Sequence, residues 1–195
     1  MRTEDFTERI YAAARPYWNT RENHVHVPEA YELCKELLRS FPEADSGVVL
    51  PAILLHDVGY VEVPEDEQLR GLAGAPIGWE PDITRRHEVA GARIAGELLR
   101  ELGYDEERTA LIEEIIDGHD SRAEAISLED AIVKDADKLW RYSESGVRIC
   151  SPWMGRSHTE FLNFVESRID DWMLTEPGRR LARETLARTR VAVGE

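Results

Sequence analysis

The chain has 195 residues, a length typical of one domain, and it carries 39 acidic against 24 basic residues for a formal net charge of −15. A field of that sign repels the nucleic-acid backbone and anionic lipid, so we expect neither a nucleic-acid polymer nor a membrane as partner. No stretch reads as a signal peptide or as a bilayer-spanning segment, which predicts a cytoplasmic protein. Cys34 and Cys150 form no spacing motif, so we expect buried thiols rather than a disulfide. The oligomeric state stays open.

Apolar residues recur at helical spacing along almost the whole chain, and alternating strand patterns are nearly absent. The sequence therefore predicts an all-α fold. In chain order, we expect helices over about residues 6–17, from about 28 to 38, 47–58, 83–102, around 111–116, 128–139, 158–172 and after 177. We expect a single domain over residues 1–195, with its core motifs at about 23–142 and the C-terminal helices of 157–193 packed on it.

Several helix boundaries have recognisable signals. Pro28 favours the first turn of the second helix, and Gly103 is expected to end the fourth. Ser127 predicts a cap for the sixth helix, and Ser157 with Glu160 forms a capping box before the seventh. In the fourth helix, Val89 is expected to face inward together with the other apolar residues at helical spacing.

One segment, residues 59–82, does not fit the helical pattern because it is rich in glycine and proline. Connections of this length are uncommon in compact domains and are often lids or binding loops. It leaves directly from His56-Asp57 and returns just before His87. Two interpretations stay open: a mobile surface loop, or a lid over a functional site.

A set of histidine and aspartate side chains lies on or at the ends of the predicted helices: His26, His56, Asp57, His87, His119 and Asp137. These types bind hard or borderline metal ions. His56-Asp57 ends the apolar run of residues 48–55, and an ionisable pair carried inward needs a partner, of which a divalent cation is the simplest. Gly59 is expected to end this helix in a left-handed conformation. Helix ends that converge at the mouth of a bundle can form such a metal site.

Three strings carry a resemblance to a known family: residues 26–30 (His-Val-Pro-Glu-Ala), 54–59 (Leu-Leu-His-Asp-Val-Gly) and 134–139 (Lys-Asp-Ala-Asp-Lys-Leu). In this order they resemble the HD-domain metal-dependent phosphohydrolase superfamily, which is all-helical. The resemblance implies a first metal held by His26, His56, Asp57 and Asp137. It also implies a second metal at His87 and His119 with Asp57 bridging, although in single-metal members such histidines line the substrate pocket. One or two divalent ions of Fe, Mn, Zn, Co or Ni suit these ligands.

The function implied by the resemblance is hydrolysis of a small phosphate ester, a nucleotide or related phosphometabolite, by metal-activated water, with Asp57 as the catalytic residue. The expected partner is therefore a small anionic phosphorylated substrate. Many members carry a lysine that can contact a substrate phosphate where this chain has Tyr60. Because the tyrosine brings no charge, the phosphate would have to be neutralised by the metals, Lys138 or Arg86. The candidates for substrate binding are therefore Tyr60, Arg86 and Lys138. Arg21 and Asn23 are weighed as further contacts, and His24 as a replacement for His26.

Two other functions are considered. Some HD-domain proteins with the six-ligand set are mixed-valent diiron oxygenases that act on a phosphonate or polyol, and Tyr60 in place of the lysine weakens the phosphatase case slightly. The third hypothesis is a non-enzymatic helical module that a closed metal site stabilises. Oxygen consumption distinguishes the first alternative, and an open coordination position argues against the second.

Overall fold

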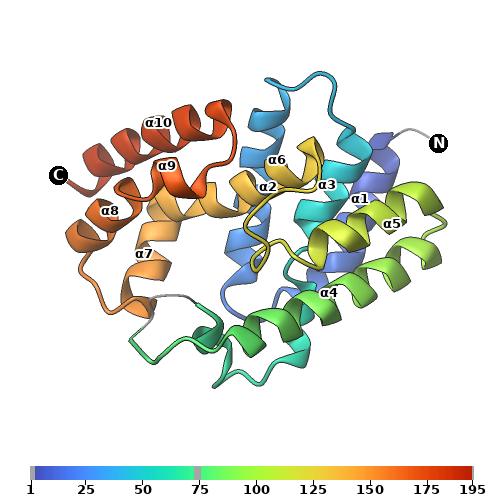
Figure 1. Ribbon diagram of the computed structural model, residues 1–195, viewed down its shortest axis with the longest axis horizontal. Coiled ribbons are helices and arrows are strands. Elements are labelled where there is room, and N and C mark those ends of the chain that lie inside the picture. Colours follow the sequence, from blue (N-terminus) through green and yellow to red (C-terminus); the bar gives the residue numbers. More distant parts are fainter. Residues whose placement is uncertain (1–2, 73–75, 195) are drawn as a thin grey trace.

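The computed structural model describes residues 3–72 and 76–194, which form an all-α structure without a strand in these ranges (Figure 1). The α-helices are α1 (Thr3–Ala14), α2 (Asn23–Leu38), α3 (Ser46–Leu55), α4 (Pro81–Glu101), α5 (Glu106–Ile116), α6 (Leu128–Leu139), α7 (Glu144–Trp153), α8 (His158–Glu166), α9 (Ile169–Trp172) and α10 (Glu176–Val193). Short 3-10 helices are η1 (Arg15–Tyr17), η2 (Val58–Glu62), η3 (Gln68–Gly71) and η4 (Trp140–Tyr142).

Helix α3 lies at the centre of the bundle. Its sequence is apolar on all sides, and all its residues except Ser46 and Leu50 are buried. A helix of this kind is stable only when other helices surround it, and α1, α2, α5 and α6 pack around it. Asp45 caps its N-terminus by accepting a hydrogen bond from the Gly47 amide. The helix therefore delivers the residues that follow its last turn, His56 and Asp57, into the interior.

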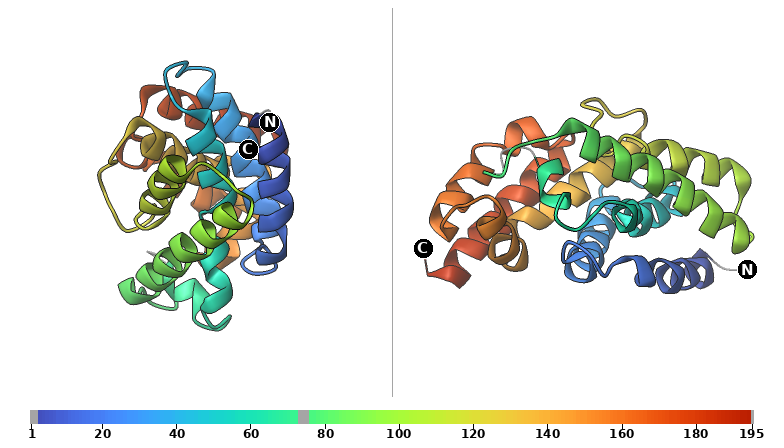
Figure 2. Two further views of the ribbon diagram at one scale, coloured as in Figure 1. Left: turned by 90° about the vertical axis from the view of Figure 1, so that its right-hand side faces the viewer. Right: turned by 90° about the horizontal axis from the view of Figure 1, so that it is seen from below.

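The molecule is elongated, with two groups of helices at opposite ends (Figures 1 and 2). Helices α4 and α5 lie side by side at one end, joined by a turn in which Gly103 has a φ of 71°. Helices α7 to α10 form the other end, where α10 packs against α6, α8 and α9. Helices α2, α3 and α6 lie between the two groups, so they are where the candidate metal ligands can meet.

The boundaries of the helices agree with the sequence in part. The caps at Ser127 and Ser157 are present, and Gly103 follows the end of α4 as expected. The prediction that the second helix begins near Pro28 was wrong, because α2 begins at Asn23. The Glu22 carbonyl accepts the amides of Val25 and His26 and thereby starts the first turn, so Pro28 lies inside the helix.

Two further expectations were wrong. The segment from Glu144 to Trp153 forms helix α7, which the sequence pattern did not predict; Ser143 caps it by accepting from the Gly146 amide. Val89, expected to face inward, is 55% exposed, since the buried face of α4 runs through Ile83, His87 and Ile94 instead.

Gly59 has a role other than the left-handed helix end expected for it, because its φ is not positive. A Cβ atom at this position would lie 2.0 Å from the His87 carbonyl oxygen and 2.4 Å from the Gly91 nitrogen. The missing side chain therefore lets η2 approach the backbone of α4. This contact holds His56-Asp57, just before η2, against the helix that carries His87.

The segment of residues 59–82 is partly ordered by buried groups, and residues 73–75 lie outside the described ranges. Tyr60 and Val63 are buried with Ile83 in a small cluster of their own. The buried Gln68 side chain donates to the Tyr60 and Val63 carbonyls. The first part of the segment is thus fixed to the bundle.

Both cysteines are buried free thiols, as expected. Within residues 3–72 and 76–194, no helix combines the length and the apolarity that crossing a bilayer requires.

Candidate metal centre

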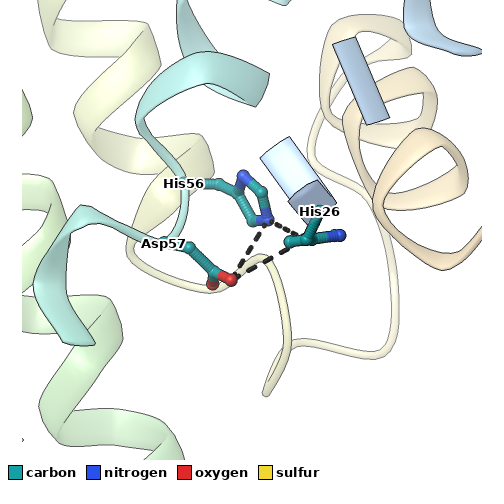
Figure 3. A group of neighbouring side chains, drawn as sticks. All are labelled: His26, His56 and Asp57. Atoms are coloured by element: carbon teal, nitrogen blue, oxygen red, sulfur yellow. Dashed lines mark hydrogen bonds and ion pairs between the residues drawn. The ribbon is translucent and has the colours of Figure 1, made fainter. Parts of the chain in front are cut away.

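Three buried side chains from two segments converge on one point (Figure 3). His26 comes from the first turn of α2, while His56 and Asp57 follow the last turn of α3. The His26 and His56 Nε2 atoms are 3.0 Å apart, and each lies 3.7 Å from Asp57 Oδ2. These three residues are called the first triad.

Asp137, from α6, adds a carboxylate to this point. Its Oδ1 atom lies 3.2 Å from His26 Nε2 and 3.5 Å from His56 Nε2. Its Oδ2 atom lies 3.3 Å from Nη1 of Arg141, one turn further along the chain. The structure therefore brings together all four residues predicted for a first metal.

A second group, the second triad, consists of Asp57, His87 and His119, all buried. The Nε2 atoms of His87 and His119 are 3.4 Å apart and lie 3.9 and 3.5 Å from Asp57 Oδ1. Asp57 thus directs one carboxylate oxygen at each triad. Asp120, which the sequence analysis did not select, has its Oδ2 atom 3.6 Å from His87 Nε2 and 3.8 Å from His119 Nε2.

The donor atoms suit a divalent transition ion. Ligands about 2.1 Å from a metal lie about 3.0 Å apart in octahedral geometry and about 3.4 Å apart in tetrahedral geometry. The distances within the two triads are close to these values. Imidazole and carboxylate without thiolate are ligands that iron, manganese, zinc, cobalt and nickel accept. The residues present therefore fit a metal ion in each triad.

Two of the histidines are held in the tautomer that metal binding requires. His56 Nδ1 lies 2.8 Å from the Ile53 carbonyl oxygen, and His119 Nδ1 lies 2.9 Å from that of Ile116. A carbonyl accepts only from a protonated nitrogen, so the lone pair of each ring sits on the Nε2 atom that faces the cluster. Each histidine bonds to the carbonyl three residues before it, a local arrangement at the end of its helix.

The charges of the cluster are balanced internally. Burial acts to raise the pKa of Asp57, but His56, His119, His26 and Arg21 hold it well below the usual range. Burial and the proximity of His119 lower the pKa of His87 to about 4, which leaves this ring neutral, as a ligand must be. Burial acts to lower the pKa of His119, but Asp120, Asp57 and Glu88 raise it to about 9. Burial likewise acts to lower the pKa of His56, but Asp57 and Asp137 raise it above its usual value. Without a metal, His119 therefore favours the protonated form, and metal binding would release the proton from its Nε2 atom.

The loop that carries His119 and Asp120 is anchored by two buried charged groups. Glu88, directly after His87, accepts hydrogen bonds from the amides of Asp120 and Ser121 and from the Ser121 hydroxyl. Lys134 donates from Nζ to the carbonyls of Gly118, His119 and Arg122, at 2.6, 3.0 and 2.7 Å. The loop is thus fixed from both sides, by α4 and by α6.

The residues proposed for substrate binding lie in different places. Tyr60 stacks on the His87 ring with 4.0 Å between centroids, and it borders a cavity of about 370 Å³ together with Lys138. Arg86 is exposed and pairs with Glu67 at 2.9 Å, and it does not border this cavity. His24, considered as a replacement for His26, is 65% exposed and pairs with Glu22.

Two arginines border the cavity instead of Arg86, namely Arg21 and Arg141. Sequence reasoning weighed Arg21 and missed Arg141. Helical spacing held the signal for Arg141, because it lies four residues after Asp137 and therefore on the same face. The signal for Asp120 was its position directly after a histidine, which repeats the His56-Asp57 doublet.

Comparisons with curated proteins and with solved structures give no match for this chain. The family model of the HD domain matches residues 24–142, which include all six predicted metal ligands. This family consists mainly of metal-dependent hydrolases, and the match spans more than half of the sequence. The chain therefore belongs to the HD domain family.

Proposed function

We propose that this protein is a phosphohydrolase that cleaves a small phosphate ester with the help of one divalent ion in each triad. One observation carries the proposal: the two buried triads share Asp57, which borders a small pocket together with Arg21 and Arg141. These two arginines also border the larger cavity, where Lys138 lies. A metal centre beside three cationic side chains suits an anionic substrate that needs activated water.

The roles of the residues follow from their positions. A divalent ion, when bound, lowers the pKa of coordinated water and polarises a phosphoryl oxygen. Asp57 directs one oxygen to each triad and so fixes the spacing of the two metal sites. Arg141 lies beside Asp137 and, with Lys138, supplies positive charge where the phosphate would lie. Tyr60 contributes a hydroxyl that stays neutral, because burial raises its pKa well above the usual range.

The test is elemental analysis of freshly purified protein, followed by phosphatase assays with each metal found. We expect two ions per chain in the natural protein, one in His87→Gln and none in Asp57→Asn, because only Asp57 belongs to both triads. Activity should fall by at least about a thousandfold in Asp57→Asn, the loss of roughly 4 kcal/mol of transition-state stabilisation. His24→Gln, which changes an exposed histidine of the same helix, should keep both metals and full activity. Full phosphatase activity in Asp57→Asn would contradict the proposal.

The second triad also fits the diiron oxygenase alternative, because that chemistry needs two neighbouring ions. Oxygen decides between the two functions. Hydrolysis of a phosphate ester under nitrogen, with manganese or cobalt as the metal, supports the phosphohydrolase. Oxygen consumption with a phosphonate or polyol, together with a mixed-valent iron signal, supports the oxygenase. A metal-loaded protein that neither hydrolyses phosphate esters nor consumes oxygen supports a structural metal site.

A further inference from the structure

The cavity beside the metal ligands has two chemically different ends. It measures about 370 Å³, near the lower limit of typical small-ligand pockets, which span roughly 300–1,000 Å³. One end is bordered by Arg21, Lys138, Arg141 and Asp120. A second, smaller pocket shares Arg21, Asp120 and Arg141 with this cavity and is also lined by Asp57, His26 and Asp137.

Arg21 is held at the polar end in a conformation that leaves donors free. The Cζ atom of its guanidinium lies over the Tyr60 ring, 4.1 Å from the centroid, and 5.6 Å from the centroid of Trp153. Its Nε atom is buried and has no hydrogen-bond partner among the described residues. Arg21 and Glu22 have φ angles of 50° and 57°, a left-handed pair that side chains rarely adopt. Strain of this kind persists where the surroundings enforce it, often at a ligand site.

The other end of the cavity is apolar and aromatic. Its walls are Met154, at the end of α7, Phe161 and Phe164 of α8, and Trp172 of α9. The Phe164 and Trp172 rings pack edge to face with centroids 5.7 Å apart. Leu72 and Trp79 also line the cavity. A Cβ atom at Gly155, in the turn after α7, would lie 3.1 Å from Pro76 Cγ.

The hydroxyl groups between the two ends are already occupied. Thr84 donates to the Gly71 carbonyl at 3.1 Å, and Ser121 donates to Glu88 at 2.7 Å. Neither side chain therefore has its proton free to donate to a sugar or polyol, which would lose hydrogen bonds from water that these two groups cannot replace. An aromatic ring, in contrast, would lose little on leaving water and would pack against other rings.

We propose that the substrate is a phosphate monoester whose organic group is aromatic, with its phosphate beside Arg21 and its ring against Phe164 and Trp172. The inference rests on the proposed function and adds the class of substrate. Arg21 precedes residues 24–142, and the aromatic wall follows them. The segments that set specificity therefore lie outside the part of the chain that matches the family.

Binding of inert phosphonates tests the inference without turnover. The probes are 1-naphthylmethylphosphonate and methylphosphonate, titrated calorimetrically into zinc-loaded protein, because zinc has no redox chemistry. Burying the aromatic ring should make the naphthyl compound bind roughly 10- to 100-fold more tightly. Trp172→Ala should reduce this ratio about tenfold or more while leaving methylphosphonate unchanged. Equal binding of the two probes to the natural protein would overturn the proposal.

Three variants separate a ligand contact from a structural effect. Arg21→Gln should lower the affinity for both probes by about tenfold or more, because a charge-assisted contact is lost. Arg21→Lys should lower the affinity less. The control is Phe6→Ala, which changes a half-buried aromatic residue of α1 that packs on Tyr104. It should leave the affinities for both probes unchanged. Unchanged affinities in Arg21→Gln would refute its assigned role.

Turnover distinguishes this inference from the function on which it rests. If 1-naphthyl phosphate is bound but not hydrolysed with any metal, the phosphohydrolase is wrong and the ligand class stands. If glycerol 3-phosphate is hydrolysed as efficiently as 1-naphthyl phosphate, the function stands and the aromatic preference is wrong.

Discussion

Glu88 positions candidate metal ligands although it belongs to neither triad. It is buried on α4, directly after His87, and its carboxylate accepts from the backbone of Asp120 and Ser121. Both the histidine before it and the loop opposite therefore depend on its position. Groups that orient metal ligands in this way commonly change metal affinity when they are altered.

Glu88→Gln should weaken the second triad selectively. The amide replaces one accepting oxygen with a donor, which would face the Asp120 and Ser121 amides or the Ser121 hydroxyl. We expect roughly 10- to 100-fold lower affinity at the second metal site and a loss of about 1–3 kcal/mol in the free energy of unfolding. Calorimetric titration of metal-free protein with zinc gives both affinities.

The matched control for this variant is Glu97→Gln, which removes the same charge from the exposed face of the same helix, where Glu97 pairs with Arg93. It should change neither affinity. Equal zinc affinities at the second site in the natural protein and in Glu88→Gln would show that the loop does not need this carboxylate.

At the residue scale, the sequence indicated the candidate metal ligands better than their surroundings. His26, His56, Asp57 and Asp137 stand in recognisable strings, and the structure places them together. Glu88 stands in no such string. Lys134 does, but the role of its side chain comes from contacts across the fold, which the string does not show. The buried ammonium of Lys134, for example, binds carbonyls of a loop 12–16 residues earlier in the chain.

At the element scale, the packing of η2 against α4 decides whether the two triads can share Asp57. Gly59 makes this contact possible, because the position that a Cβ atom would take is occupied by backbone atoms of His87 and Gly91. The sequence predicted a glycine that ends a helix, which is the commoner use. Only the position of α4, set by tertiary packing, shows that close approach is the reason.

Gly59→Ala should separate the two elements. The added methyl group would overlap backbone atoms, which cannot rotate away as a side chain can. We expect a loss of about 2–3 kcal/mol in the free energy of unfolding, at the upper end of overpacking effects, together with loss of the second metal. Urea denaturation and elemental analysis measure the two effects.

Gly91→Ala is the comparison for Gly59→Ala, because Gly91 lies in the same contact but has more room. The nearest atoms to its added Cβ would be Ile116 Cγ2 at 3.2 Å and the His56 carbonyl oxygen at 3.3 Å. We expect it to cost less than about 1 kcal/mol. Equal losses in the two variants would mean that the approach of η2 to α4 is not the limiting contact.

The helices themselves show where local signals suffice. Capping residues located the starts of α6 and α8 correctly, because a cap is a local interaction. Pro28 misled the boundary of α2. A helix can include a proline, which lacks the N–H group and so removes one hydrogen bond to the carbonyl four residues earlier. Helix α7 has no strong pattern of its own, and it is stabilised by packing against η4 and α8, which the sequence of that segment does not reveal.

At the scale of the whole molecule, a net charge of −15 surrounds a site lined by cationic side chains. The overall field repels anions, so an anionic ligand must be attracted at short range by Arg21, Lys138, Arg141 and the metal ions. Long-range fields of this kind are screened over about 8 Å at physiological ionic strength. The charge of the molecule thus disfavours large polyanions, while a small anion can still be bound inside the cavity.

The candidate metal ligands come from α2, the end of α3, α4, the loop after α5, and α6, so a bound ion would connect most of the bundle. An ion that binds only the folded state stabilises it by mass action, by about 4 kcal/mol at a thousand times its Kd. Each kcal/mol raises the Tm of a domain of this size by roughly 2–4 °C. Stripping with EDTA should therefore lower the Tm by about 10 °C, and zinc should restore it, as calorimetric scans can measure. Asp57→Asn should show no zinc-dependent shift, and an identical Tm in stripped and reloaded natural protein would mean that the cluster does not bind zinc in the folded state.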